Sequence, residues 1–295
     1  MSSVPAQEEF LVVRGLRHRV LRWGPRQAEP WILLHGFQDC ADTFQFLVDE
    51  LPRDWQFIAP DWRGFGGSEQ THRPYWFPDY LADLEALLDV WSPNVPARLL
   101  GHSMGGNIAG LYAGIRPERV AALVSLEGFG LMRAAPDQAP ARYAEWLDAV
   151  RNGPRDPRYE SAAAVVTALR RRQPRVSTER AEFIARVWTR ATETGEVGLA
   201  FDPWHRLVNP VLYRREEAEA CWRRVIAPVL LLLGTESEYR RRLEMTDDIG
   251  AFQRCFRDIE VHDLDALGHM LHHEAPERVA ALVRTFAERI FEVRE

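Results

Sequence analysis

Short apolar runs alternate along the chain with longer segments whose apolar residues recur at helical spacing. The runs predict buried strands at residues 31–34, 57–59, 98–100, 121–126, 229–233 and 259–261. The helical segments are residues 43–51, 80–91, 104–115 and 276–291. Two earlier runs, at residues 10–13 and 18–23, predict a hairpin that turns near Gly15. Alternating strands and helices predict an α/β fold with a mostly parallel, doubly wound sheet.

This alternation is interrupted between residues 131 and 224. The interval has no convincing strand pattern, and prolines separate helical stretches around residues 141–150, 161–172, 178–192 and 214–224. We therefore expect residues 1–130 and 225–295 to form the core and residues 131–224 to form a helical lid inserted between two strands. In an open α/β sheet, such an insertion can lie over the carboxyl ends of the strands, where ligands bind.

Composition and charge restrict the classes of partner. The 295 residues carry a formal charge of −6, which argues weakly against binding to nucleic acid. No apolar run approaches the roughly 18 residues that a membrane span needs, and the first ten residues do not resemble a secretory signal. Three cysteines (Cys40, Cys221 and Cys255) are expected to be free thiols. We expect a cytoplasmic protein without membrane or nucleic-acid partners, either a monomer or a homodimer.

The most informative segment is Gly101-His102-Ser103-Met104-Gly105, which directly follows a predicted strand and precedes a predicted helix. It matches the pattern G-x-S-x-G, in which the serine lies on a sharp turn and the small flanking residues avoid clashes. This turn exposes the hydroxyl at a helix N-terminus, where the free N–H of Met104 faces a developing oxyanion. The segment predicts Ser103 as a nucleophile.

A serine nucleophile needs a base, and His269 is the candidate. It follows the last predicted strand and a loop, so the sheet would deliver it to the same edge as the serine. His272 and His273 could form a metal cluster with it beside Asp263 and Asp265, but the serine already accounts for His269, and we expect no metal. The chain has no P-loop, and no G-x-G-x-x-G follows a strand, so we also expect no cofactor.

A second oxyanion donor is expected from an early loop between a strand and a helix. The run Leu34-His35-Gly36-Phe37-Gln38 occupies that position, and the N–H of Phe37 is the natural candidate. His35 is expected to hold the loop in shape.

These motifs together resemble the α/β-hydrolase superfamily, and in particular lidded serine hydrolases of the esterase and lipase type. The matches are His35-Gly36-Phe37, residues 61–68, residues 101–105, and Gly268-His269 followed by residues 274–277. They occur in the order typical of the family and cover the chain end to end, apart from the lid. The resemblance implies an α/β-hydrolase fold and a catalytic triad.

The acidic member of the triad departs from the common pattern. In many relatives it is an aspartate three residues after the glycine that ends the strand at residues 229–233, and here that position is Ser237. Glu238 and Glu236 flank it and are candidates. Glu127, at the end of the strand that follows the nucleophile, is the other candidate and the preferred one, because a buried carboxylate needs a partner such as His269.

A serine at the elbow predicts acyl transfer, whereas the haloalkane dehalogenases and epoxide hydrolases of this superfamily use an aspartate there. The expected function is a serine hydrolase, a carboxylesterase acting on a small or medium, largely apolar ester. C–C bond (β-diketone) hydrolysis, perhydrolysis and non-catalytic ligand binding on the same fold remain alternatives. Aromatic residues of the lid are candidates for the substrate pocket: Trp146, Trp188 and Trp204.

Overall fold

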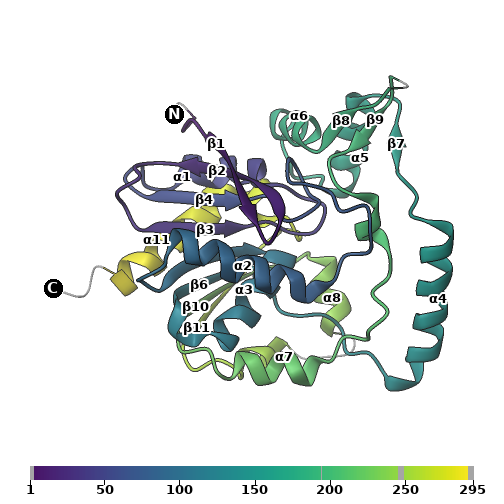
Figure 1. The fold of residues 1–295 in the computed structure, drawn as a ribbon. Helices are drawn as coiled ribbons and strands as arrows, with labels where there is room; N and C mark the ends of the chain where they lie inside the picture. The colour runs from purple at the N-terminus through teal and green to yellow at the C-terminus, as the bar shows by residue number, and fades with distance from the viewer. Residues whose placement is uncertain (1–2, 194, 245–248, 292–295) are drawn as a thin grey trace.

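The computed structural model describes residues 3–193, 195–244 and 249–291, and its centre is an eight-stranded sheet in the order β1-β2-β4-β3-β5-β6-β10-β11 (Figure 1). Strands β1 and β2 pair antiparallel with each other, as β2 does with β4, and the other neighbours are parallel. The strands are β1 (Gln7–Val13), β2 (Leu16–Trp23), β3 (Pro30–Leu34), β4 (Gln56–Pro60), β5 (Ala97–His102), β6 (Val120–Leu126), β10 (Val229–Gly234) and β11 (Ile259–Leu264). The mostly parallel sheet expected from the alternating pattern is confirmed.

Helices cover both faces of this sheet. Side chains of α2 and α3 contribute to one buried cluster, and those of α1 and α11 contribute to the other. Successive residues of β3 alternate between them, because side chains of a strand point to opposite faces: Ile32 and Leu34 join the first cluster, and Trp31 and Leu33 join the second. The core helices are α1 (Gln45–Glu50), α2 (Phe77–Trp91), α3 (Met104–Ile115), α7 (Arg215–Trp222), α8 (Glu238–Glu244), α9 (Ile249–Gln253), α10 (Leu271–Glu274) and α11 (Pro276–Phe291).

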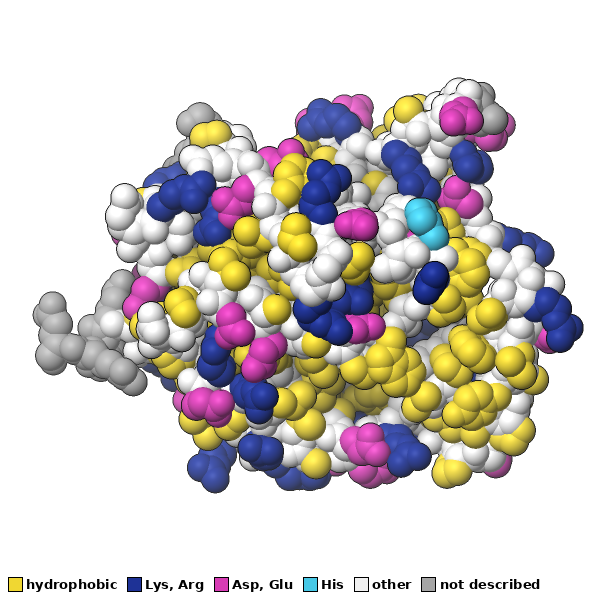
Figure 2. Space-filling model, viewed as in Figure 1, with side chains coloured by type: hydrophobic (Ala, Val, Ile, Leu, Met, Phe, Trp, Pro, Cys, Tyr) yellow, Lys and Arg dark blue, Asp and Glu magenta, His cyan; other side chains and the backbone are white. Residues whose placement is uncertain are grey.

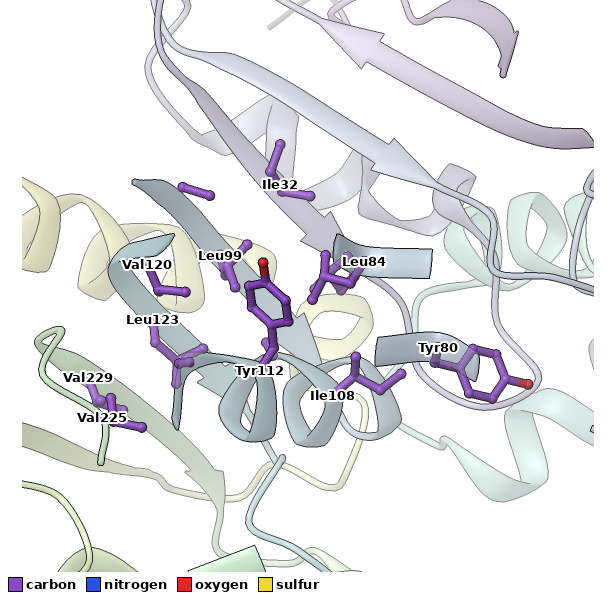
Figure 3. Packing of buried hydrophobic residues seen from close by; sticks show 14 of the residues in the cluster. Ile32, Tyr80, Leu84, Leu99, Ile108, Tyr112, Val120, Leu123, Val225 and Val229 are labelled. Atoms are coloured by element: carbon purple, nitrogen blue, oxygen red, sulfur yellow. The ribbon is translucent and has the colours of Figure 1, made fainter. Parts of the chain in front are cut away.

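Helix α3 is the element on which the position of the nucleophile depends. Figure 3 shows its residue Tyr112 directed toward Leu99 of β5, and Ile108 and Leu123 of β6 belong to the same buried cluster. Full burial of one such side chain contributes about 1.5–3 kcal/mol. This packing fixes the N-terminal end of α3 against the carboxyl end of β5.

The inserted segment is less helical than expected. It contains α4 (Ala139–Asn152), α5 (Ala162–Arg172) and α6 (Thr178–Val187), and the hydroxyls of Ser161 and Ser177 cap the last two. It also contains a three-stranded antiparallel sheet, β7 (Arg158–Tyr159), β9 (Val197–Leu199) and β8 (Thr189–Ala191), so the prediction of a purely helical insertion was wrong. The predicted helix at residues 178–192 ends at Val187, because the chain turns there into β8. Strands of two or three residues are too short to show alternation.

The last predicted helix of the insertion belongs to the core, because α7 packs against α3. Helix α4, in contrast, has no buried side chain and lies at the right in Figure 1, away from the sheet. Hydrophobic side chains gather around it in Figure 2, and Tyr143 and Leu147 are about half exposed, at 49% and 56%. In the described part of the chain, no helix is both long and apolar enough to cross a membrane.

A buried histidine anchors the insertion to the core. The ring of His205 is stacked between Phe65 and Tyr75, with centroid distances of 3.9 and 3.5 Å. Its Nε2–H donates to the Arg63 carbonyl at 3.0 Å, and the Tyr80 hydroxyl, 3.1 Å away, donates to Nδ1. Burial lowers the pKa of His205 to about 3, so the folded protein holds this ring neutral.

This depressed pKa predicts a loss of stability in acid. The neutral ring contributes fully to the free energy of unfolding above pH 6.5. This contribution is lost as the pH falls toward 3, because in that range the imidazole binds a proton in the unfolded chain but not in the folded protein. We expect the difference in free energy of unfolding between wild type and His205→Gln to fall by on the order of 2–3 kcal/mol between pH 7 and pH 4. Urea unfolding across that range measures it, and two parallel curves would contradict it.

Candidate active site

Ser103 lies on the turn between β5 and α3 in a strained conformation, with φ +50° and ψ −114°. Its N–H donates to the Leu126 carbonyl at 2.8 Å, which ties the turn to β6. The flanking glycines are required by close backbone contacts. A Cβ on Gly101 would lie 2.5 Å from the backbone of Gly105, and a Cβ on Gly105 would lie 2.0 Å from the Leu34 carbonyl oxygen. Such a backbone conformation costs about 1–3 kcal/mol, and the surrounding packing maintains it.

An unbroken chain of hydrogen bonds leads from this serine to a buried carboxylate. The Oγ of Ser103 is 2.9 Å from Nε2 of His269, and Nδ1 of His269 is 3.1 Å from Oε2 of Glu127. An ionised carboxylate only accepts, so the proton of the neutral ring is on Nδ1, and Nε2 accepts from the serine hydroxyl. Nucleophile, base and orienting carboxylate therefore have the geometry that nucleophilic catalysis by serine needs.

Glu127 is positioned by the end of β6, where its backbone has φ +58° and its N–H donates to the Leu232 carbonyl. The side chain has no exposed surface. Its Oε1 accepts from the Gly234 N–H at 2.6 Å, and its Oε2 accepts from the Ser237 hydroxyl. These donors, together with His269, offset the cost of burying the carboxylate.

The loop after β3 lies against the nucleophile. A Cβ on Gly36 would lie 3.2 Å from the Cβ of Ser103, so the next residue, Phe37, follows at close range. His35 holds this loop: its Nε2 accepts from the Trp62 N–H at 3.0 Å, and the Trp62 indole donates to its carbonyl at 3.1 Å. Met104 is the first residue of α3. Both expected donors to the oxyanion, the N–H groups of Phe37 and Met104, thus belong to segments adjoining Ser103.

Comparison with known proteins identifies the family of this chain. The family model for the alpha/beta hydrolase fold matches residues 29–276. The chain belongs to the α/β-hydrolase family. It is 30% identical over 241 residues to a serine hydrolase-like protein of Dictyostelium discoideum. This match covers 75% of this chain and 64% of that protein. It is 40% identical over 116 residues to a serine hydrolase-like protein of Danio rerio, which covers 37% of this chain and 34% of that one. Both matches therefore span less than two thirds of the relatives' own lengths.

Solved structures of the same fold cover nearly the whole chain. A hypothetical protein of Pseudomonas aeruginosa PAO1 superposes with a TM-score of 0.83 at 27% identity, covering 96% of this chain and 99% of that one. The thioesterase domain from the curacin biosynthetic pathway superposes with a TM-score of 0.81 over 95% and 99%. At 22% identity this second likeness concerns the fold alone.

The two alternative acids have other partners than His269. The side chain of Glu238 is 77% exposed and pairs with Arg242 at 3.8 Å, and that of Glu236 is half exposed and pairs with Arg175. Among the described residues, the carboxylate hydrogen-bonded to His269 is that of Glu127. Ser237, at the position where the resemblance led us to expect an aspartate, donates its hydroxyl to that same carboxylate.

A cavity of about 200 Å³ lies between the loop after β3 and the insertion. Its apolar lining includes Phe37, Val165, Leu169, Trp188, Phe201 and Met270. Of the three tryptophans expected to line the pocket, the structure places Trp188 there. Trp146 instead lines a smaller cavity with Trp76 and Pro210, because it lies on the distant helix α4, and Trp204 lines neither cavity. For Trp146 and Trp204 a place in the substrate pocket stays a prediction, and the structure sets both apart from this cavity.

Two residues beside the base were not found from the sequence. The ring of Tyr239 stacks on that of His269, with a centroid distance of 4.5 Å and an interplanar angle of 20°. Ser237 was noted only as the position that lacks an aspartate. Neither carried a signal, because a tyrosine in a short polar helix and a serine just before that helix are ordinary in sequence and gain a partner only through the fold.

The geometry predicts that Glu127 orients His269. Glu127→Gln should slow labelling of Ser103 by a fluorophosphonate about 10²- to 10⁴-fold at neutral pH, because an amide cannot hold the Nδ1–H tautomer or stabilise the imidazolium. The rate constant is measured by intact mass. Glu238→Gln is the matched control and should label within about twofold of wild type. Equal loss in both variants, or in the control alone, would contradict this assignment.

Proposed function

We propose that this hydrolase cleaves carboxylic esters of small or medium, largely apolar acyl groups through an acyl-enzyme. The observation that supports the proposal is the hydrogen-bonded chain from the Oγ of Ser103 through His269 to Glu127. A serine at its free pKa is a weak nucleophile, and such a chain is how proteins activate it.

In the first half of the reaction, Oγ of Ser103 attacks the ester carbonyl while Nε2 of His269 takes the hydroxyl proton. Glu127 stays ionised and stabilises the imidazolium through Nδ1–H. The carbonyl oxygen becomes an oxyanion that accepts hydrogen bonds from the N–H groups of Phe37 and Met104. Collapse of this intermediate breaks the bond to the alkoxide, and Nε2–H returns its proton to form the alcohol.

In the second half, water replaces the alcohol. Nε2 of His269 takes a proton from the water as its oxygen attacks the acyl-enzyme, and the second tetrahedral intermediate collapses to the acid and free Ser103. The side chain of His269 is 19% exposed, so water reaches the base from solvent. No group other than substrate, water and these side chains is needed for the balance of protons.

The proposed size and chemistry of the substrate rest on the cavity between the loop after β3 and the insertion. Its walls include Phe37, which is the expected oxyanion donor, and Met270, which follows His269 in the chain, together with apolar side chains of the insertion. A space of about 200 Å³ accommodates a short or medium acyl chain and is smaller than usual drug-sized pockets. This favours apolar acyl groups of modest length.

Thioesters and β-diketones remain alternative substrates, because a serine triad attacks their carbonyls as well. Perhydrolysis, which generates a peracid, remains an alternative reaction of the same triad. Relatives illustrate the range: one solved structure is a thioesterase domain, and a protein of Shewanella oneidensis, 32% identical over 149 residues, is a cis-3-alkyl-4-alkyloxetan-2-one decarboxylase. Esters are preferred to amides as substrates because alkoxides leave more easily than amines. Ligand binding without catalysis is the alternative from a different class.

Labelling with a fluorophosphonate separates the enzyme from the non-catalytic protein. We expect one adduct per wild-type chain in intact-mass analysis, because the activated Oγ attacks phosphorus as it would attack an acyl carbon. Ser103→Ala should give no adduct and His269→Ala should label at least about a thousandfold more slowly. Absence of an adduct under conditions that label a known serine esterase would refute the enzyme.

A series of p-nitrophenyl esters tests the substrate class. We expect kcat/KM to be highest for butyrate or octanoate and to fall at least about tenfold for palmitate, because the longer chain exceeds the cavity. Matched thioesters and a β-diketone are assayed in parallel with the same protein. Faster turnover of a thioester or diketone, with the fluorophosphonate adduct intact, would leave the triad in place and replace the proposed substrate class.

A further inference from the structure

Four buried side chains below the nucleophile elbow have no role in the proposed chemistry. They are Asp39 from the loop after β3, His102 from the end of β5, and His272 and His273 from α10, with exposed fractions of 3%, 1%, 0% and 0%. Ligand atoms of Asp39, His102 and His272 all lie within 4.8 Å of one another. Three segments far apart in sequence thus bring one carboxylate and several imidazoles to one point.

The carboxylate of Asp39 is satisfied on one oxygen only. Its Oδ1 accepts three hydrogen bonds, from the Cys40 N–H at 2.9 Å, the Thr43 hydroxyl at 2.8 Å and the Trp188 indole N–H at 2.9 Å. Its Oδ2 accepts none within the described part of the chain and faces the histidines. Burying a carboxylate oxygen without a donor costs free energy, so we expect this atom to bind a cation or a proton.

The ring nitrogens on the other side are also without partners. Nε2–H of His102 donates to the His269 carbonyl at 2.9 Å, so Nδ1 carries the free lone pair, and that atom has no partner among the described residues. Gly36 leaves space beside it, since a Cβ there would lie 2.7 Å from Nδ1. His272 has no hydrogen bond on either nitrogen, and Nε2 of His273 has none.

The distances from Oδ2 of Asp39 to His272 and His273 fit a shared ion better than direct hydrogen bonds. Oδ2 of Asp39 is 3.5 Å from Nε2 of His272 and 3.6 Å from Nε2 of His273, longer than the range for hydrogen bonds of about 2.7–3.2 Å. Two ligands bound at 2.0–2.2 Å to a tetrahedral Zn²⁺ are about 3.3–3.5 Å apart. His102 already has the outer contact typical of a metal ligand, because its other nitrogen donates to a backbone carbonyl.

We propose that Asp39 Oδ2, His102 Nδ1 and His272 Nε2, with His273 Nε2 beside them, bind one divalent transition-metal ion of the Zn²⁺ class. Imidazole and carboxylate ligands in a tetrahedral arrangement suit Zn²⁺, and Co²⁺ can replace it. The site is buried, and it takes no part in the reaction at Ser103. The ion joins the loop after β3, the elbow and the segment that carries His269.

A second group of possible ligands differs from this cluster because an arginine supplies its positive charge. Cys40, Asp42 and Asp61 also converge, but Arg19 pairs with both carboxylates, at 2.6 and 3.1 Å, and backbone N–H groups bind Asp61. There the positive charge is already supplied by the protein. At Asp39, the ion pairs formed within the described residues are those with His272 and His273.

The test uses the full chain, stripped with a chelator, dialysed and titrated with ZnCl₂. We expect one Zn²⁺ per chain by calorimetry and by elemental analysis after gel filtration, together with a higher melting temperature. Loading with Co²⁺ should give the visible absorption of a tetrahedral site. Wild-type protein that binds no stoichiometric Zn²⁺ and gives no such spectrum would refute the site, and the four side chains would then share protons without a metal.

Variants locate the ion. Asp39→Asn and His272→Gln should each weaken Zn²⁺ binding roughly a hundredfold or more. His262→Gln is the matched control, because His262 is a partly exposed histidine that also pairs with a carboxylate, Glu260, and it should bind as wild type does. His269→Ala should also retain one Zn²⁺, which separates this site from the catalytic base.

Circular dichroism establishes that each variant is folded. Should Asp39→Asn fail to fold, His272→Gln and the Co²⁺ spectrum of the wild type decide the question. Wild-type affinity in folded His272→Gln, or loss of the ion in His269→Ala alone, would overturn the assignment. Each of these outcomes is independent of whether the substrate is an ester.

Discussion

The buried carboxylate of Glu127 is the constraint on which the arrangement of the site depends. A charge without exposed surface must be met by donors, and each of these lies more than a hundred residues beyond Glu127 in the chain: the Gly234 N–H at the end of β10, the Ser237 hydroxyl and Nδ1 of His269. They converge because β6 and β10 are neighbours in the parallel sheet and end at the same edge. The same carboxylate therefore orients the base, holds the loop after β10 and requires this strand order.

The strained backbone of the site is supported by packing close to it. Ser103 and Glu127 both have positive φ, and both directly follow strands of the central sheet. Each is tied across to the next strand by its N–H, Ser103 to Leu126 and Glu127 to Leu232. The cost of the two turns is thus offset by the sheet and by α3, whose side chains pack on β5 and β6 (Figure 3). Geometry that would relax in a peptide is maintained because the hydrophobic clusters on both faces would have to open first.

Local signals explain which features could be predicted from the sequence. The apolar runs, the G-x-S-x-G turn and the position of His269 each depend on a few neighbouring residues, and the family match agrees with the fold they predicted. Glu127 could be selected over its rivals only by asking what a carboxylate at the end of a buried strand would pair with. The strands Arg158–Tyr159 and Val197–Leu199 were missed because they are too short for a pattern and exist only through each other. The convergence of Asp39, His102 and His272 was missed for the same reason, since spacing along the chain says nothing about it.

Asp39 connects the insertion with the histidines below the elbow. One of its oxygens accepts from the indole of Trp188, at the end of α6 in the insertion and in the wall of the cavity, and the other faces the histidines below the elbow. His102 in turn holds the carbonyl of His269. A single carboxylate thus lies between the wall of the cavity and the segment that carries His269. A cation bound at Oδ2 would draw charge away from Oδ1 and weaken the bond to Trp188, while fixing the loop that carries Phe37. An ion below the elbow would therefore act on the loop after β3 and on the contact with Trp188, without entering the reaction at Ser103.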